Sequence, residues 1–401
     1  MKLHSETYDS YKNAEGEWSE TIPSEWQEKR VKDLFRLVTD AAPADNDYEL
    51  LSLYAGIGVK PRKDLEARGN KASSTDGYWI VRKNDIVVNK LLAWMGSVGL
   101  SEYDGVTSPA YDVLRQVSKD IDPRYFAYLF RTETAKKIFR KNSRGIMDMR
   151  LRLYFDKLGA ITTPVPPYKT QIAISKYIDR QVALIDEKKI ILNKKLDLLE
   201  LLKERVIFNA VNEANIGDKN WNEIRLKDIL TIKSGNTGIQ KTDDGEFPIY
   251  GANGVIGMAH HFEQDQDKIL IGRVGSCGEV TLATGKYVVS DNALIVTTKN
   301  RVSQSYLYYK LCSLSLGNLA NKNAQPLLTG TAIKNIITSI PDYDEQILIS
   351  TKLKAKCSEI YNFIELVKLK IEKLGELRIA LINDALTGRV KCDLYMDEVA
   401  A

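Results

Sequence analysis

The sequence predicts an α+β protein with two mixed α/β globular domains, joined by two long helices that form an antiparallel coiled coil. Three observations predict this fold. Two long stretches carry the heptad pattern of a coiled coil, the second repeats the first position by position, and a mixed pattern of short strands and helices precedes each one. The chain is therefore expected to be an internal repeat whose halves are related by a pseudo-twofold axis.

The heptad pattern runs through residues 172–212 and again through residues 347–387, and neither stretch contains proline. Apolar side chains recur at steps of four and three, the 3.5-residue period of a supercoiled seam. The two seams match without a gap at an offset of 175 (353 − 178), and this match argues against two unrelated amphipathic helices. The predicted seam residues are Ile178, Val182, Ile185, Leu192, Leu196, Leu199, Val206, Leu353, Ile360, Ile364, Val367, Ile371, Leu374 and Leu381.

The order of these segments predicts how the helices pair. The first helix leaves the first globular domain and leads to the second, and the second helix starts from the second domain. The second helix must run back to bury its seam on the first, so the pair is expected to be antiparallel. A helix of this length spans about 60 Å at 1.5 Å per residue, which would make the coil a spacer of nearly fixed length.

Each globular domain begins with the same phrase. Trp26 precedes residues 30–34 (RVKDL), and Trp221 precedes residues 225–229 (RLKDI) at an offset of 195 (221 − 26). The offset falls to 175 at the helices, so the first domain is longer by 20 residues (195 − 175), which we place in its loops. The expected division is a polar and aromatic N-terminal arm (1–25), a first domain (26–165), a helical region (166–213), a second domain (214–340), a second helical region (341–390) and a tail (391–401).

Inside the globular domains the pattern alternates between short strands and turns. Asp122 and Pro123 form a helix start, so a helix is expected over residues 125–141, with a counterpart at 306–319. Loops rich in Gly, Asn, Lys and Ser separate the elements. Strands are expected at residues 50–54, 78–81, 86–89, 111–114, 269–271, 287–289 and 294–297, and loops at 56–74, 234–245 and 250–257.

Composition narrows the class of protein. A chain of 401 residues should hold two or more domains. No run reaches the length of a membrane span and no signal peptide opens the chain. The four cysteines lie far apart, which predicts neither a disulfide framework nor a zinc site and favours a cytoplasmic location.

Charge is unevenly distributed. The net charge is +4, but residues 124–152 alone contain nine basic and two acidic side chains, a balance of +7 (9 − 2). This block indicates a surface that faces a polyanion. The alternative is an ordinary solvated helix face.

No convincing catalytic constellation is present. Residues 165–168 (VPPY) resemble the Asn/Asp-Pro-Pro-Tyr motif of amino-methyltransferases but lack the amide or carboxylate, and they are expected to be a helix-start turn. The glycines at 56–58 and 251–254 do not form a cofactor fingerprint. His260 and His261 are adjacent and lack a third ligand, so we expect no metal site.

With no catalytic, cofactor or metal motif found, the remaining candidate chemistry is ligand binding by polar loop residues. Arg and Lys can contact guanine, and Asn and Gln can contact adenine, although a solvated loop position or a phosphate contact is the more ordinary role for any one of them. The candidate DNA-binding residues are Lys60, Arg62, Lys63, Lys71, Lys90, Ser108, Tyr111, Arg144 and Arg150 in the first domain, and Asn236, Tyr250, Asn253, Arg273, Ser276, Asn292, Asn323 and Gln325 in the second.

The order of these phrases resembles the specificity subunits of Type I restriction-modification systems. The resemblance covers nearly the whole chain and is specific because modest phrases occur in the same order twice. They are residues 22–26 (IPSEW), 30–34 (RVKDL), 85–90 (DIVVNK), 108–114 (SPAYDVL), 271–278 (IGRVGSCG) and 290–293 (SDNA), with the two Pro-to-Gln-Ile helix starts at 166–172 and 341–347.

The resemblance implies two target-recognition domains, each of which recognises one half of an asymmetric bipartite site in double-stranded DNA, with the coiled coil setting the gap. It also implies two modification (methyltransferase) subunits as partners, and restriction subunits where present. The resemblance places S-adenosylmethionine, ATP and magnesium in those partners, so this chain is expected to be non-catalytic and to hold no cofactor. The alternatives are a coiled-coil scaffold without DNA binding, or a stand-alone DNA methyltransferase or nuclease.

Overall fold

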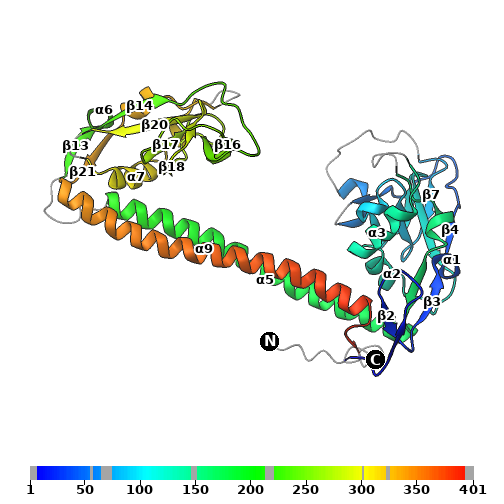
Figure 1. The fold of residues 1–401 in the computed structure, drawn as a ribbon. Coiled ribbons are helices and arrows are strands. Elements are labelled where there is room, and N and C mark those ends of the chain that lie inside the picture. The colour runs from blue at the N-terminus through cyan, green and yellow to red at the C-terminus, as the bar shows by residue number, and fades with distance from the viewer. Residues whose placement is uncertain are drawn as a thin grey trace. The chain divides into compact units, whose positions relative to one another are not determined.

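The computed structural model describes residues 7–54, 57–64, 75–145, 151–212, 221–299, 302–321 and 326–392. The chain forms two compact units. Unit 1 comprises Met1–Ile190 with Glu372–Ala401, and unit 2 comprises Ile191–Ile371. Each unit therefore holds one globular domain together with a segment of both long helices (Figure 1). The expected division treated the helical regions as separate from the globular domains, whereas the structure groups each coil segment with the domain beside it.

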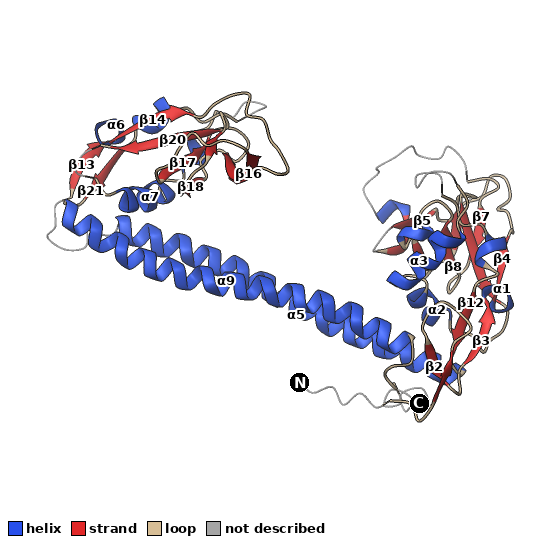
Figure 2. Ribbon diagram, viewed as in Figure 1, coloured by secondary structure: helices blue, strands red, loops and turns tan. Residues whose placement is uncertain are grey.

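The centre of unit 1 is an antiparallel four-stranded sheet (Figure 2). Its strand order is β4 (Phe35–Val38), β11 (Tyr111–Gln116), β8 (Ile86–Asn89) and β9 (Val98–Leu100). All four residues of β8 are buried, which fits a central strand with both faces covered. Short paired strands surround the sheet: β1 (Tyr11–Asn13) with β2 (Thr21–Pro23), β3 (Gln27–Arg30) with β12 (Thr162–Val165), β5 (Leu51–Tyr54) with β6 (Gly58–Pro61), and β7 (Trp79–Val81) with β10 (Gly105–Thr107).

Unit 2 repeats this architecture. Its sheet has the order β14 (Leu230–Ser234), β20 (Ala293–Thr298), β17 (Lys268–Gly272) and β18 (Val280–Ala283). The antiparallel pair β13 (Asn222–Arg225) and β21 (Ile337–Ile340) corresponds to β3 and β12 of unit 1. A three-stranded sheet completes it, with β15 (Phe247–Gly251) between β16 (Gly254–Ala259) and β19 (Val288–Val289).

The helix expected over residues 125–141 is two helices. In the structure α2 (Pro123–Leu129) ends, and α3 (Glu133–Asn142) begins after Thr132. The Thr132 side chain accepts a hydrogen bond from the amide of Ala135, so Thr132 is an N-cap that the sequence reasoning passed over. The expected counterpart at 306–319 is likewise α7 (Gln304–Ser313) followed by the 3-10 turn η5 (Leu316–Leu319).

Shorter helices complete the two units. In unit 1, α1 and α4 and two 3-10 turns flank the sheet, and unit 2 has α6 and α8. Their bounds are α1 (Val31–Leu34), η1 (Arg62–Asp64), η2 (Ala93–Met95), α4 (Phe155–Leu158), α6 (Leu226–Ile229) and α8 (Gly330–Lys334). The repeated phrase RVKDL/RLKDI forms the equivalent helices α1 and α6, whose apolar residues are buried in both units.

The two heptad stretches form α5 (Tyr168–Asn212) and α9 (Tyr343–Leu386), which are antiparallel within each unit. In unit 1 Arg378 Nη1 lies 3.7 Å from Asp186 Oδ1, and in unit 2 the ammonium of Lys203 lies 5.0 Å from the centre of the Tyr361 ring. The numbers of both pairs add to 564 (186 and 378, 203 and 361), as one antiparallel register requires. All fourteen predicted seam side chains are buried or half-buried. The expected fold class, with its antiparallel coil, is confirmed.

A buried glutamine secures the start of each long helix. Gln171 donates through Nε2 to the carbonyl of Pro166 (2.8 Å) and accepts from the amide of Asp122 (2.8 Å). Gln346 repeats this arrangement in unit 2 with the carbonyl of Pro341 (2.9 Å) and the amide of Ser303 (2.9 Å). Each glutamine thus ties the N-terminus of the globular domain's helix to the first turn of the coil.

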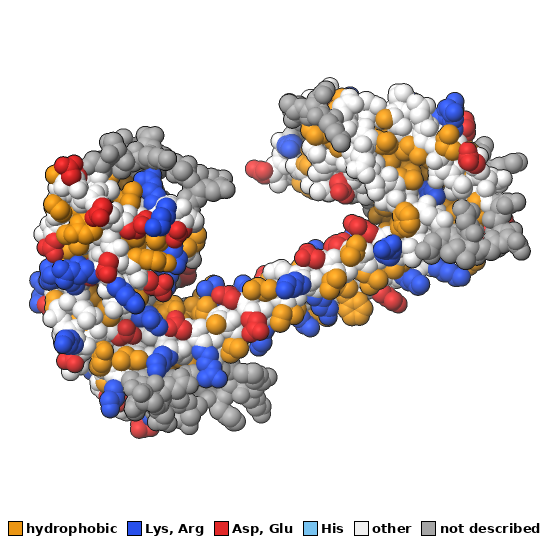
Figure 3. Space-filling view, turned by 180° about the vertical axis from the view of Figure 1, so that it is seen from behind, with side chains coloured by type: hydrophobic (Ala, Val, Ile, Leu, Met, Phe, Trp, Pro, Cys, Tyr) orange, Lys and Arg blue, Asp and Glu red, His pale blue; other side chains and the backbone are white. Residues whose placement is uncertain are grey.

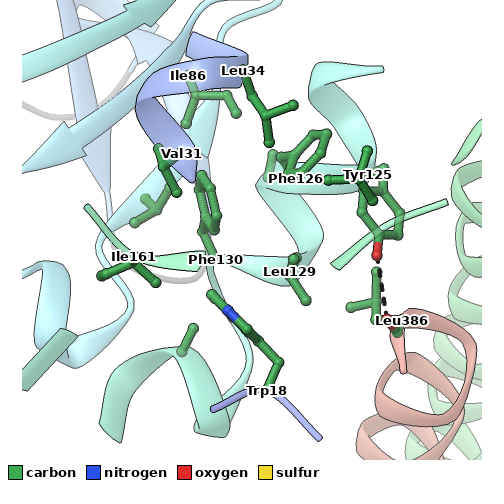
Figure 4. Close-up of a cluster of buried hydrophobic side chains, with 14 of the residues drawn as sticks. Trp18, Val31, Leu34, Ile86, Tyr125, Phe126, Leu129, Phe130, Ile161 and Leu386 are labelled. Atoms are coloured by element: carbon green, nitrogen blue, oxygen red, sulfur yellow. Dashed lines mark hydrogen bonds between the residues drawn. The ribbon is translucent and has the colours of Figure 1, made fainter. Parts of the chain in front are cut away.

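The C-terminal end of α5 is closed by a buried lysine. Lys310 is 2% exposed, and its ammonium donates to the carbonyl of Val211 (2.8 Å) and to Asn212 Oδ1 (2.8 Å). A cation at this place satisfies a free carbonyl and complements the negative end of the helix. The end of α9 is closed differently, because Tyr125 donates to the Leu386 carbonyl and Gly388 takes a left-handed φ of 72° (Figure 4).

The described part of the N-terminal segment, from residue 7 onward, belongs to the core of unit 1. Tyr8, Trp18 and Ile22 are buried there, with Trp18 beside Phe130 in the cluster that Figure 4 shows. Trp18 also donates to the carbonyl of Thr162 (2.7 Å). The expectation of an arm with few core residues is therefore wrong for residues 7–25.

In the described parts of the chain, no helix has the length and apolar character needed to cross a membrane.

Gln171 and Gln346 act as clamps at the starts of the two long helices, and replacing either should destabilise the unit that contains it. Gln171→Ala leaves a buried amide and carbonyl without partners, which should lower the free energy of unfolding by about 2–4 kcal/mol. Hydrogen exchange should accelerate at the amide of Asp122 in Gln171→Ala and at the amide of Ser303 in Gln346→Ala. Lys169→Ala, an exposed neighbour, is the control. Unchanged exchange at both amides would contradict the clamp.

Lys310 should make stability depend on alkaline pH. Burial lowers the pKa of its ammonium from 10.5 to about 8. Between these values the unfolded chain holds a proton that the folded chain has released, so this group's contribution to stability rises with pH. The unfolding free energy of the wild type relative to Lys310→Met should rise by up to about 3 kcal/mol from pH 8 to 10.5. Urea titrations of both proteins at stepped pH measure this difference, and a flat difference would refute the buried, depressed ammonium.

Candidate nucleic-acid interface

Both central sheets present polar loops at the end remote from the coil. In unit 1, β4 begins next to α1 and the β3–β12 pair, which leads into α5. Since β4 and β8 are both antiparallel to β11, they run in the same direction, and the end of β8 lies away from the start of α5. The same argument places the end of β17 away from the start of α9 (Figure 2).

In unit 2 this end gathers most of the predicted second-domain residues. Arg273 follows β17, its amide donates to the carbonyl of Asn292 (2.8 Å), and its Nη1 donates to Ser234 Oγ (3.1 Å). The carbonyl of Ser276 and that of Ala252 crowd Gly272, where a Cβ would lie 2.1 Å and 2.4 Å from the two oxygens. The loops after β14, β15 and β17 therefore meet at one place.

The remaining candidates of unit 2 border the same place. Tyr250 packs edge-on against Tyr287 with ring centres 5.4 Å apart, and its carbonyl accepts from the amide of Ser290. Asn236 is exposed and forms an isolated β-bridge with Ser290. Its side-chain amide donates a hydrogen bond to the Glu263 carboxylate (2.8 Å). Asn253 is exposed in the turn between β15 and β16. This exposure makes the Asn253 side chain accessible to a ligand.

In unit 1, Lys90 holds the place that Arg273 holds in unit 2. Its ammonium donates to the carbonyl of Pro109 (2.7 Å) and lies 3.4 Å from Asp112 Oδ1. Asp112 is 5% exposed; burial raises the pKa of its carboxyl, and the Lys90 charge opposes that rise. Ser108 and Tyr111 flank this pair, since the Tyr111 amide donates to the carbonyl of Ser108 (2.9 Å) and Tyr111 is half-buried.

Three predicted cations of unit 1 lie on β6 or directly after it instead. Lys60 donates to Tyr103 Oη (3.2 Å), and this bond raises the pKa of the Lys60 ammonium. Lys63 is exposed and forms an ion pair with Glu49. Arg62 starts η1 and is half-buried. Arg62 lies near Tyr111, because its charge lowers the pKa of the Tyr111 hydroxyl, which burial raises.

Four predicted site residues lie outside the described residues: Lys71, Arg150, Asn323 and Gln325.

The basic block at residues 124–152 is not one free cationic patch. Arg124 lies 2.8 Å from Asp179, and Lys141 lies 2.7 Å from Glu17. Arg144, a predicted DNA contact, lies 3.2 Å from Asp156, so its charge is partly compensated. All three carboxylates come from segments outside the block, and the balance of +7 therefore overstates the local field.

Sequence reasoning missed the residues that hold the two equivalent cations. Asp112 and Ser234 contact Lys90 and Arg273 across the sheet, 22 and 39 positions away in the sequence (112 − 90, 273 − 234). It also missed two later segments that contact the backbone of these cations. The amide of Leu153 donates to the Lys90 carbonyl, and the amide of Leu328 donates to the Arg273 carbonyl. The repeat offset of 175 (328 − 153) would have paired these two leucines.

The described segments contain no group of three or more His, Cys, Asp or Glu side chains that could hold a metal ion. His260 lies 3.4 Å from Asp244, and both side chains are largely exposed.

The outer faces of the long helices carry a second kind of surface. Figure 3 shows hydrophobic side chains between the charged ones along these helices. In unit 2 these side chains are between 42% and 65% exposed, well above the values of seam residues such as Ile364 at 2%. The exposed apolar residues in the unit 2 segments are Ile191, Leu198, Leu201, Leu202 and Phe208 on α5, and Tyr343, Ile347, Leu348, Tyr361, Phe363, Leu366 and Leu369 on α9.

Comparisons with known proteins agree with this architecture. A chain from a structure of a type I R-M system, studied for its complex assembly and conformational transition, has a TM-score of 0.72 at 14% identity, covering 92% of this chain and 99% of that chain. The HsdS subunit from Thermoanaerobacter tengcongensis has a TM-score of 0.55 at 14% identity, covering 92% of this chain and 98% of that one. Likeness at this identity shows the fold.

Sequence comparison identifies the family. The EcoprrI specificity subunit of a Type I restriction enzyme from Escherichia coli is 27% identical over 135 residues, which is 32% of this chain and 34% of that protein, so the match spans about a third of the relative's length. The family described as the Type I restriction modification DNA specificity domain matches twice, at residues 23–198 and 218–374. Each match contains one globular domain and most of the helix that follows it, and the chain therefore belongs to the family of Type I restriction modification DNA specificity domains, of which it carries two copies.

Proposed function

We propose that this chain is the DNA sequence-specificity subunit of a Type I restriction-modification complex, and that each unit recognises one half of a bipartite site. One observation carries the proposal: two units of the same topology each place a cation, Lys90 or Arg273, after the equivalent strand of the central sheet. Two equivalent cationic loop clusters in one chain suit two half-sites on one duplex.

The site should be asymmetric. The equivalent positions differ in chemistry: β8 ends in Asn89 and β17 in Gly272, while Tyr111 of β11 corresponds to Ala293 of β20 in the strand register. Different side chains at equivalent positions present different donors and acceptors to base edges. The coil, whose seam keeps one register in both units, would set the unread gap between the half-sites.

The chemistry of methylation and cleavage would belong to partner subunits. The resemblance to specificity subunits places S-adenosylmethionine, ATP and magnesium there, so this chain supplies recognition and positioning and no catalytic group. Two modification subunits are the proposed partners, with restriction subunits where the system has them. The exposed apolar side chains of α5 and α9 suit such docking, since contiguous exposed apolar surface commonly marks a protein interface.

The proposed function is tested by selection from randomised duplex DNA. The full chain, alone and assembled with its modification subunits, should enrich a motif of two unlike blocks separated by a constant gap. Without partners it should bind duplex DNA with a steep salt dependence and should neither methylate nor cut it when given S-adenosylmethionine or Mg²⁺. Absence of any enriched motif would favour a scaffold, and modification by this chain alone would favour a stand-alone enzyme.

Lengthening the coil should lengthen the gap. A heptad keeps the seam in phase and extends a helix by about 10 Å, the length of about three base pairs. One heptad inserted between Lys189 and Ile190 of α5 and another between Leu374 and Gly375 of α9 preserve the antiparallel register. The selected gap should grow by about three base pairs while both blocks stay unchanged. An insertion in α5 alone is the control. A constant gap in the double insertion would refute the proposal that the coil sets the distance between the half-sites.

The apolar outer face should be needed for assembly. Leu366 and Leu369 of α9 are 46% and 50% exposed and lie one helical turn apart. Leu366→Ser with Leu369→Ser should weaken binding of a modification subunit by about 10- to 100-fold, from the apolar area no longer buried. Calorimetry measures this affinity, and the melting temperature should stay unchanged. Lys368→Ala is the control, and equal affinity in the double variant would exclude this face from the interface.

A further inference from the structure

The two cations that carry the proposed function are held by different chemistry. Lys90 and Arg273 occupy equivalent places, because each follows the last residue of the equivalent strand and each carbonyl accepts from the returning chain at 2.9 Å. Their side chains nevertheless meet different partners. This difference bears on how each unit contacts DNA.

Lys90 is paired with a buried carboxylate. Its side chain is 21% exposed and that of Asp112 is 7% exposed. The carbonyl of Pro109 at 2.7 Å and Asp112 Oδ1 at 3.4 Å occupy two of the three ammonium N–H donors. Among the described residues, Asp112 Oδ2 is buried without a hydrogen-bond partner, so Asp112 interacts with Lys90 through one oxygen. The ammonium therefore keeps one donor for a ligand, in a direction that the other two contacts define.

Among the described residues, no carboxylate forms an ion pair with Arg273 at the equivalent place. In the strand register Asp112 pairs with Val88, and its counterpart Leu294 pairs with Ile271. Leu294 is apolar and 4% exposed. The guanidinium of Arg273 is instead oriented by the neutral hydroxyl of Ser234 at 3.1 Å. Arg273 thus keeps its net charge where Lys90 is compensated.

The two arrangements have different consequences for binding a polyanion. A compensated ammonium adds a directed hydrogen bond but little net charge, so it displaces few counterions when DNA binds. An uncompensated guanidinium adds both a forked donor and a full charge. Direction without charge favours discrimination between acceptors, since a net charge is attracted to every phosphate alike.

We propose that Asp112 is a positioning residue that neutralises Lys90 and directs its remaining donor to a base edge, so that unit 1 contacts its half-site through a charge-compensated pair and unit 2 through the uncompensated Arg273. This inference rests on the proposed function. It assigns Asp112 a role in specificity although its carboxylate is buried and need not touch DNA.

The test uses the full chain and two measurements: base preference by selection from randomised duplexes, and the slope of log affinity against log salt on the enriched duplex. The double variant Lys90→Met with Asp112→Asn should relax one position in one block and leave the slope unchanged, because it removes the positive and the negative charge together. Asp112→Asn should relax the same position and steepen the slope by about 0.9, because it unmasks one charge. Arg273→Met should relax the other block and make the slope shallower by about 0.9.

Lys83→Met is the matched control, since Lys83 is exposed in the turn that precedes β8, at the opposite end of the same strand. It should leave the base preference unchanged. A purely structural role for Asp112 would lower the melting temperature of Asp112→Asn without changing the slope or the base preference. That result would overturn the inference, as would a shallower slope in the double variant.

The two levels of the proposal fail separately. If the wild-type chain enriches no motif, the proposed function is wrong. If it enriches a two-block motif whose positions ignore Lys90 and Asp112, only the role of the pair is wrong.

Discussion

The contact on which the rest of the structure depends is the antiparallel seam between α5 and α9. Within unit 1 the seam joins the α5 segment that ends at Ile190 to the α9 segment that begins at Glu372. Within unit 2 it joins the α5 segment that begins at Ile191 to the α9 segment that ends at Ile371. Ile178 and Ile364, at 1% and 2% exposed, are among its most buried residues, despite the exposed outer faces of both helices. Without the seam, unit 1 would lose the segment that closes its core at Leu386.

The junction between globular domain and coil uses different chemistry in the two units. In unit 1, Arg124 and the hydroxyl of Tyr128 both bind the carboxylate of Asp179. In unit 2, Tyr309, the counterpart of Tyr128, lies near Cys312, whose thiol pKa burial raises to about 12, and near Cys357, which is 3% exposed. Thiols held in their neutral form pack as small hydrophobic groups. The same topology thus tolerates an ionic or an apolar junction, because the glutamine clamps fix the helix starts in both.

Much of this molecule could be predicted from its sequence. The seam period, its repetition and the absence of proline within it predicted both long helices, because heptad spacing is a local property of the chain. The order of the segments along the chain predicted that the helices pair antiparallel. The repeated phrase ending in Gln171 and Gln346 marked the helix starts. Lys90 and Arg273 were identified as candidate contacts from residue type and loop position alone, and their role in DNA binding stays a prediction.

Tertiary structure alone decided which charges face a partner. Arg124, Lys141 and Arg144 formed a strongly basic block in the sequence, and their pairing with Asp179, Glu17 and Asp156 exists only after distant segments meet. The burial of Tyr8 and Trp18, which sequence reasoning had assigned to an arm, follows from the same cause. Heptad periodicity is set by neighbours along the chain, whereas compensation of a charge and burial of an aromatic ring depend on contacts between segments far apart in sequence.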